Sequence, residues 1–185
     1  MVRDRSGTGT LFARLAWLLW GDKQLDAAEE AASRAINLFS EQGNQFHVCQ
    51  SHRALGDIYH SKGEWERAIY HLEAALGIPS SFNWRAQLFW IRHTLARLSF
   101  GQDKFGDAHA HVELAKSHAV DNAYHLGLTM ELQANFWCQQ HQFEEAKSEG
   151  LRAAESFGKL GAANDLERCR ELLQRIEQEL KNPVV

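Results

Sequence analysis

The sequence predicts an all-α protein in which a helical hairpin is repeated along the chain. Apolar residues recur at helical spacing over most of the 185 residues. Only two prolines are present, and both lie outside the helix interiors that this spacing outlines. One pattern of small and large apolar residues returns at a nearly constant interval. These three observations predict a fold built from stacked copies of one unit.

Composition limits the class of protein and its partners. With 44% hydrophobic residues, the chain can bury a sizeable core. A formal charge of −4 gives no basic surface for nucleic acid, so no nucleic-acid partner is expected. The run at residues 11–20 contains Arg14 and is too short to span a membrane. Cys49, Cys138 and Cys169 are odd in number and far apart, which favours reduced thiols and a cytoplasmic location.

Residues 44–77 illustrate the repeated unit. After Gly63, large and small apolar residues such as Trp65, Ala68 and Leu72 follow one face of a helix. A similar stripe precedes Gly63, and the tetrapeptide SKGE between the two stripes is typical of a short turn. The segment is therefore predicted to form a hairpin of two antiparallel helices.

Four copies of the second helix of this hairpin align without gaps. Each copy begins with a large apolar residue, has an alanine three positions later and another alanine seven positions after that. A small residue stands twelve positions before the first of these alanines, which lets two antiparallel helices approach closely. Eight aligned alanines exceed what an amphipathic helix alone requires. The first alanines are Ala28, Ala68, Ala108 and Ala146, at intervals of 40, 40 and 38 residues, and the small residues are Ala16, Gly56, Ala96 and Ala134.

The second copy resembles the tetratricopeptide repeat (TPR). Residues 55–59 read LGDIY and residues 68–75 read AIYHLEAA, close to the signature of that family, although His52 and Leu72 replace the usual aromatic residues. The period of about 40 exceeds the usual 34, so the chain is similar to the long-helix subgroup of kinesin light chains, LGN-type scaffolds and MalT-like regulators. The resemblance implies a right-handed α-α superhelix of four hairpins.

The pattern divides the chain into three kinds of segment. Residues 1–9 are polar and contain glycine, so they are expected to be flexible and the first helix to begin near Thr10. Residues 163–182 have apolar positions on one face only, as expected of a capping helix that covers the last repeat. Four repeats are expected within residues 10–162, at 10–43, 44–81, 82–120 and 121–162.

The resemblance also implies a function. In this family the first helix of each pair lines a concave groove, which implies a non-catalytic scaffold that binds a peptide or a partner helix. Aromatic rings and arginines at the matching positions suit an acidic peptide with apolar anchors. For any one of these residues, surface exposure or packing between repeats is an equally good interpretation. The expected groove residues are Arg14, Trp17, Trp20, Arg53, Asp57, His60, Trp90, His93, Arg97, Phe100, Glu131 and Asn135.

A second interpretation is a C-terminal sensor or oligomerisation domain of a larger signalling NTPase or transcription regulator. Trp17 and Trp20 would then lack a neighbouring repeat and mediate self-association, or they simply cover the core. No enzyme, cofactor or metal is expected. His109 and His111 would point to nearly opposite sides of a helix, and no nucleophile stands beside a base.

Overall fold

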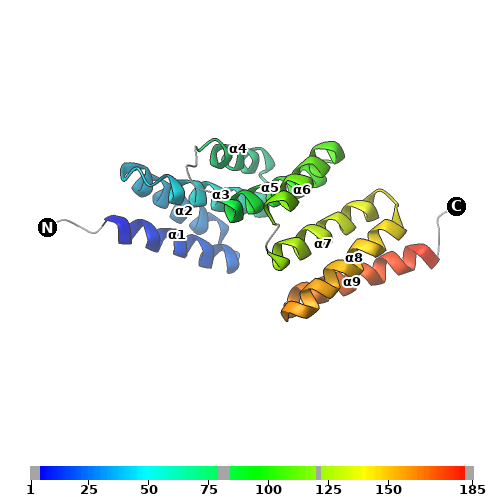
Figure 1. Ribbon diagram of the computed structural model, residues 1–185. Coiled ribbons are helices and arrows are strands. Elements are labelled where there is room, and N and C mark those ends of the chain that lie inside the picture. The colour runs from blue at the N-terminus through cyan, green and yellow to red at the C-terminus, as the bar shows by residue number, and fades with distance from the viewer. Residues whose placement is uncertain (1–4, 79–83, 120–121, 182–185) are drawn as a thin grey trace. The chain divides into compact units, whose positions relative to one another are not determined.

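The structure is a computed structural model that describes residues 5–78, 84–119 and 122–181. Within these residues the chain is entirely helical, with short turns and no strand (Figure 1). This confirms the expected all-α class. Nine helices occur in the described ranges: α1 (Arg5–Gly21), α2 (Leu25–Glu41), α3 (Gln45–Lys62), α4 (Trp65–Leu76), α5 (Arg85–Gly101), α6 (Phe105–His118), α7 (Ala123–Gln139), α8 (Phe143–Leu160) and α9 (Ala163–Lys181).

The chain forms two compact parts, Met1–Leu98 and Ser99–Val185, called here the N-terminal and C-terminal parts. In the N-terminal part α1 packs on α2, α2 on α3 and α3 on α4, and α1 also contacts α3. In the C-terminal part α6 packs on α7, α7 on α8 and α8 on α9. Within each part, these helices thus pack on their neighbours in sequence, which is the hairpin packing of a TPR-like array. None of the helices in the described ranges is long and apolar enough to cross a membrane.

The repeated alanines lie in the core. Ala28, Ala68, Ala108 and Ala146 are completely buried. In the second repeat the close approach of the helices depends on Gly56, because a Cβ atom there would lie 2.5 Å from Cγ of Leu72. The small residue therefore makes room for the large side chain on the facing helix.

The turns repeat with the same spacing as the alanines. The turn inside each hairpin contains one residue in the left-handed conformation, which ordinary side chains adopt at a cost of about 1–2 kcal/mol. Only the second hairpin uses glycine there, and the Asp and His in two others belong to the types that tolerate this conformation best. These residues are Lys23 (φ 63°), Gly63 (φ 76°), Asp103 (φ 56°) and His141 (φ 58°).

The first helix begins at Arg5, earlier than the start near Thr10 that the polar N-terminal segment suggests. The reason for this correction is that Gly9 acts as a packing residue rather than as a helix breaker. A Cβ atom on Gly9 would lie 2.8 Å from Cε1 of Phe39, which is fully buried on α2. The same contact recurs between Gly127 and Phe157 in the C-terminal part, at 2.9 Å.

Candidate interaction site

A cavity of about 270 Å³ lies between α1 and α3 in the N-terminal part. Arg14 and Trp17 of α1 line it together with His47, Gln50 and Arg53 of α3. These two helices are the first helices of the first two repeats, whose exposed faces the sequence assigns to the groove. Three of the expected groove residues therefore surround one cavity.

Arg53 and Trp17 form one wall of this cavity. The guanidinium of Arg53 lies over the Trp17 ring at 4.6 Å, a cation–π contact. Arg53 also donates to Asp57 Oδ2 at 2.9 Å and to Gln87 Oε1 of α5 at 3.3 Å. Because its charge is offset by Asp57 and its position is fixed, Arg53 shapes the cavity rather than offering a free cation.

Asp57 connects α3 to α5. Its Oδ1 accepts a hydrogen bond from Thr94 Oγ1 at 2.7 Å, while Oδ2 accepts from Arg53. Burial raises the pKa of Asp57, although Arg53, Thr94 and Arg97 oppose that effect. Asp57 is thus an internal partner of Arg53, and its carboxylate is already engaged.

Trp20 and Trp17 face α3 rather than pointing away from the array. Trp20 Nε1 donates to Ser61 Oγ of α3 at 2.9 Å, and the two indole rings meet edge to face at 5.2 Å. Both rings are half-buried. The exposed apolar surface of α1 consists instead of leucines.

Among the expected groove residues, Arg14 and Arg97 are the arginines whose charge no ion pair with a described residue offsets. Both side chains are exposed, and neither forms an ion pair with any described residue. Burial together with the charge of Arg97 lowers the pKa of His60 to about 4, so His60 is neutral at neutral pH. Trp90 is half-buried on α5.

His93 and Phe100 are buried in the fold. His93 stacks on the ring of Phe89 with centroids 5.6 Å apart. In the C-terminal part Phe100 packs against Phe136 at 5.2 Å. These two residues have the packing role that the sequence left open as the alternative to a groove role.

Glu131 and Asn135 also have partners within the protein. Glu131 accepts two hydrogen bonds from Arg168 of α9, at 2.9 and 2.8 Å. Asn135 Nδ2 donates to the backbone oxygen of Glu131 at 2.9 Å. The bidentate pair ties α7 to α9, so the carboxylate of Glu131 is occupied by the last helix.

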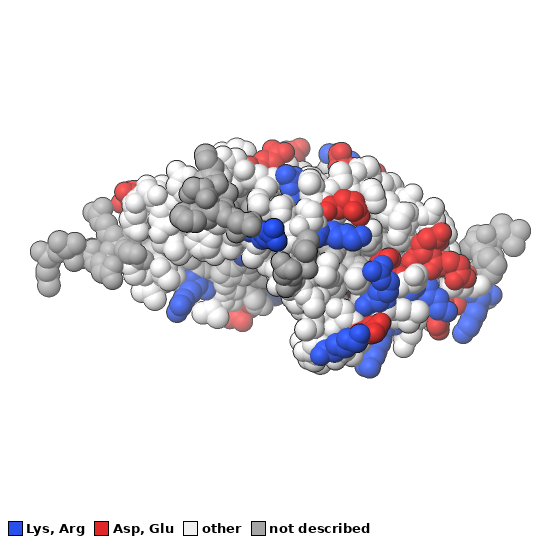
Figure 2. Space-filling view, viewed as in Figure 1, with Lys and Arg blue, Asp and Glu red and all other residues white. Residues whose placement is uncertain are grey.

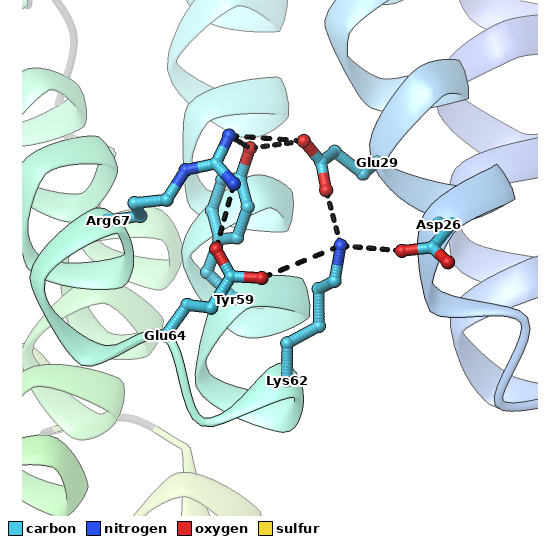
Figure 3. A network of polar contacts seen from close by, with 6 residues as sticks. All are labelled: Asp26, Glu29, Tyr59, Lys62, Glu64 and Arg67. Atoms are coloured by element: carbon cyan, nitrogen blue, oxygen red, sulfur yellow. Dashed lines mark hydrogen bonds and ion pairs between the residues drawn. The ribbon is translucent and has the colours of Figure 1, made fainter.

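A polar network joins the first repeat to the second (Figure 3). Tyr59 of α3 donates to Glu29 of α2 at 2.6 Å, and Lys62 contacts the carboxylates of Asp26 and Glu29 at 2.7 and 2.6 Å. Arg67 of α4 lies over the Tyr59 ring at 4.0 Å. Burial acts to raise the pKa of Glu29, but the hydrogen bonds from Lys62 and Tyr59 outweigh it and the pKa is lowered. Sequence reasoning missed this network, because its members on α2 lie 30 or more residues before those on α3 and α4.

The described residues offer no metal site or reactive thiol. Among them, no group of three His, Cys, Asp or Glu side chains could hold a metal ion. The three cysteines are free thiols. Burial raises the pKa of Cys49 to about 11 and that of Cys169 to about 12, which keeps both in the poorly reactive thiol form.

Comparison with known proteins identifies a family for the N-terminal residues and a similar fold for the chain. Residues 4–81 match the tetratricopeptide repeat family. A similar solved structure is the kinesin light chain-like BtubC (BKLC) from P. vanneervenii, with a TM-score of 0.54 and 14% identity over 98% of this chain and 94% of that chain. At this identity the likeness shows the fold, and none of the curated proteins matches the chain significantly. TPR domains are generally protein-interaction modules and are typically non-catalytic. Residues 4–81 therefore belong to the tetratricopeptide repeat family, and the described helices of the chain form a TPR-like all-α array.

Proposed function

We propose that the protein binds an acidic segment of a partner polypeptide in the cavity between α1 and α3, without catalysing a reaction. The observation that supports this most is the preformed wall of Trp17 and Arg53 beside the free guanidinium of Arg14. An aromatic surface can bury an apolar anchor of the partner, and a free arginine can bind a carboxylate.

The size and rigidity of the cavity favour a peptide side chain over a small-molecule ligand. At about 270 Å³ the cavity is below the range of about 300–1,000 Å³ that is usual for ligand pockets. Arg53 is held by Trp17, Asp57 and Gln87, so little conformational freedom is lost from this wall on binding.

The charge of the residues that line the cavity favours an acidic partner. The two charged side chains that line the cavity are Arg14 and Arg53, and Asp57 offsets the charge of Arg53. Arg14 therefore leaves one positive charge at the site. An acidic residue next to a large apolar residue in the partner satisfies both Arg14 and Trp17.

The test compares peptides of opposite charge on matched variants. Labelled peptides of about 12 residues, with one central Trp or Leu flanked by either acidic or lysine residues, are titrated by fluorescence anisotropy. Arg14→Glu should weaken the acidic peptide by about tenfold and improve the lysine peptide. Arg170→Glu on α9 changes an exposed arginine elsewhere and should leave both affinities unchanged. Equal effects of the two substitutions, or no preference for the acidic peptide, would overturn the proposal.

A further inference from the structure

The outward face of α1 carries an exposed stripe of leucines. Leu11, Leu15 and Leu18 lie four and three residues apart, which places them on one side of the helix. Their exposed fractions are 68%, 42% and 67%. Arg14 and Trp17, which line the cavity, are not part of this stripe.

Every later repeat buries the positions that correspond to these leucines. The three positions lie five and one residues before the small residue of the repeat and two residues after it. In the later repeats they are 9% exposed or less. They are Ser51, Leu55 and Ile58 in α3, Ile91, Leu95 and Leu98 in α5, and Thr129, Gln133 and Phe136 in α7.

The contacts of α3 show which kind of helix covers this face. Lys62 continues the α3 stripe one turn beyond Ile58, and its ammonium group contacts Asp26 and Glu29 of α2. Since α2 packs on α3, the stripe of α3 lies under α2, the alanine-rich second helix of the preceding repeat. The same face of α1 therefore has the shape that receives a helix with small residues on its docking side.

Charge distinguishes the occupant of α1 from α2. The residue that corresponds to Lys62 is Asp22, which directly follows the end of α1, is exposed and forms no ion pair with the described residues. On α3 a cation faces two carboxylates of α2. At the end of α1 a carboxylate lies at that point, so the complementary helix must present a cation there.

A second copy of this chain does not supply such a helix. The alanine faces of its second helices are already buried, as Ala28, Ala68, Ala108 and Ala146 are 0% exposed. Two copies of α1 packed antiparallel about Leu15 would place Thr8 opposite Asp22 and bring the two Arg14 residues together. Neither arrangement places a cation opposite the carboxylate of Asp22.

We propose that the leucine stripe of α1, with Asp22 at its end, is a docking surface for an amphipathic helix of a partner protein. The partner helix carries small apolar residues on its docking face and a basic residue opposite Asp22. It runs antiparallel to α1, as α2 does to α3. This surface is separate from the cavity between α1 and α3 and does not depend on the function proposed there.

The test uses a peptide helix derived from α2. The probe is a labelled peptide with the sequence of residues 22–43 carrying Asp26→Lys and Glu29→Lys, and the control peptide has the unchanged sequence. The lysine peptide should bind the protein at least about tenfold more tightly than the unchanged peptide. Asp22→Lys in the protein should reverse this preference, which a merely structural role of Asp22 would not do.

Two double variants locate the binding surface. Leu11→Ser with Leu18→Ser should abolish binding of both peptides while leaving the circular dichroism spectrum unchanged, because both side chains are exposed. Leu114→Ser with Leu151→Ser changes exposed leucines on α6 and α8 and should have no effect. Binding that survives the α1 substitutions means that the peptide has replaced α2 elsewhere, and it overturns the proposal.

The state of the protein without peptide completes the test. Light scattering should show a monomer for the wild type and for both double variants. A wild-type dimer that Leu11→Ser with Leu18→Ser converts to a monomer would make a second copy the occupant and overturn the choice of a partner helix. Failure of both peptides to bind, or failure of Asp22→Lys to reverse the preference, would also overturn it.

Discussion

The two terminal helices present opposite kinds of surface. On α1 the outward residues are Leu11, Leu15 and Leu18, and residues 5–21 contain no acidic side chain. On α9, by contrast, every large apolar residue in the described part is at least half-buried, and the exposed positions are polar, charged or small. Figure 2 shows charged side chains gathered over the C-terminal part, whereas the visible face of the N-terminal part is largely uncharged.

This difference comes from the residues on the outward face of each helix. The apolar stripe of α9 packs against α7 and α8. The bidentate pair of Arg168 with Glu131 fixes the position of α9 on α7. The face of α1 keeps leucines at positions that every later repeat buries. Which end exposes an apolar face is therefore decided by the residues of the outward face rather than by the fold.

The largest effect that separates the two ends is expected from leucine truncation. Leu172 on α9 is 2% exposed and packs with Ala134, Ala146 and Ile176. Leu172→Ala should lower the free energy of unfolding by about 2–5 kcal/mol. Leu18→Ala on α1 should change it by less than about 0.5 kcal/mol, because that side chain is exposed. Urea denaturation followed by circular dichroism measures both, and a similar loss in the two variants would contradict the comparison.

Replacing a glycine by alanine should change the free energy of unfolding in opposite directions in the two parts. A Cβ atom on Gly56 would lie 2.5 and 2.6 Å from Cγ and Cδ2 of the fully buried Leu72, so Gly56→Ala should destabilise by about 1–3 kcal/mol. On Gly150 the nearest atom is the end of the half-buried Leu173 side chain, at 3.0 Å. Gly150→Ala should therefore be neutral or stabilise by up to about 1 kcal/mol through helix propensity.

A compensating substitution checks the cause of the Gly56 effect. Adding Leu72→Val to Gly56→Ala removes the two Cδ atoms of Leu72, and Cδ2 is one of the two atoms that the new Cβ atom would meet most closely, at 2.6 Å. The third repeat has this combination naturally, with Ala96 and Val112 at the corresponding positions. The double-mutant cycle, measured by the same denaturation, should give a favourable interaction energy of about 1 kcal/mol. Additive losses would mean that contact with Leu72 is not what makes Gly56→Ala harmful.

The fold was predictable because its signals are local or periodic. Repeated alanines must be buried whatever the neighbouring helix is, and all four were found in the core. The early start of α1 was not predictable, because Gly9 is explained only by Phe39, which lies 30 residues further along the chain. The turns at Lys23 and His141 also lack the glycine that would have marked a left-handed residue.

The candidate site was predictable only in part, for a related reason. The spacing of the repeats placed Arg14, Trp17 and Arg53 on facing helices, and they line one cavity. Whether a side chain is free depends on its partner from another helix, which no periodic pattern contains. Arg168 on α9 donates hydrogen bonds to the carboxylate of Glu131, and the ring of Phe136 on α7 packs against that of Phe100.

A pair of histidines predicts that acid destabilises the N-terminal part. His52 Nδ1 and His71 Nδ1 are 3.0 Å apart between α3 and α4, so the contact holds one proton, and a second would set two N–H groups against each other. The Tyr59 ring stacks on His71, and Arg67 lies over the same tyrosine. Burial lowers the pKa of His52, and burial with the charges of His52 and Arg67 lowers that of His71 to about 4.

The smallest expected effect is therefore a loss of stability on acidification that belongs to the N-terminal part. The pKa of His71 is about 4 in the folded protein and about 6.5 in the unfolded chain, so the unfolded chain binds more protons and stability falls as the pH drops from about 6.5 toward 4. Allowing for its half-buried position, the loss between pH 7 and pH 5 should be about 1 kcal/mol. The lowered pKa of His60 also reduces stability as the pH falls, whereas the raised pKa of Asp57 increases it. Thermal unfolding at the two pH values measures this difference in stability. The difference should be smaller for His71→Gln than for the wild type. For His109→Gln, in the C-terminal part, it should equal that of the wild type. An equal reduction in both variants would mean that the acid sensitivity does not come from the histidine pair.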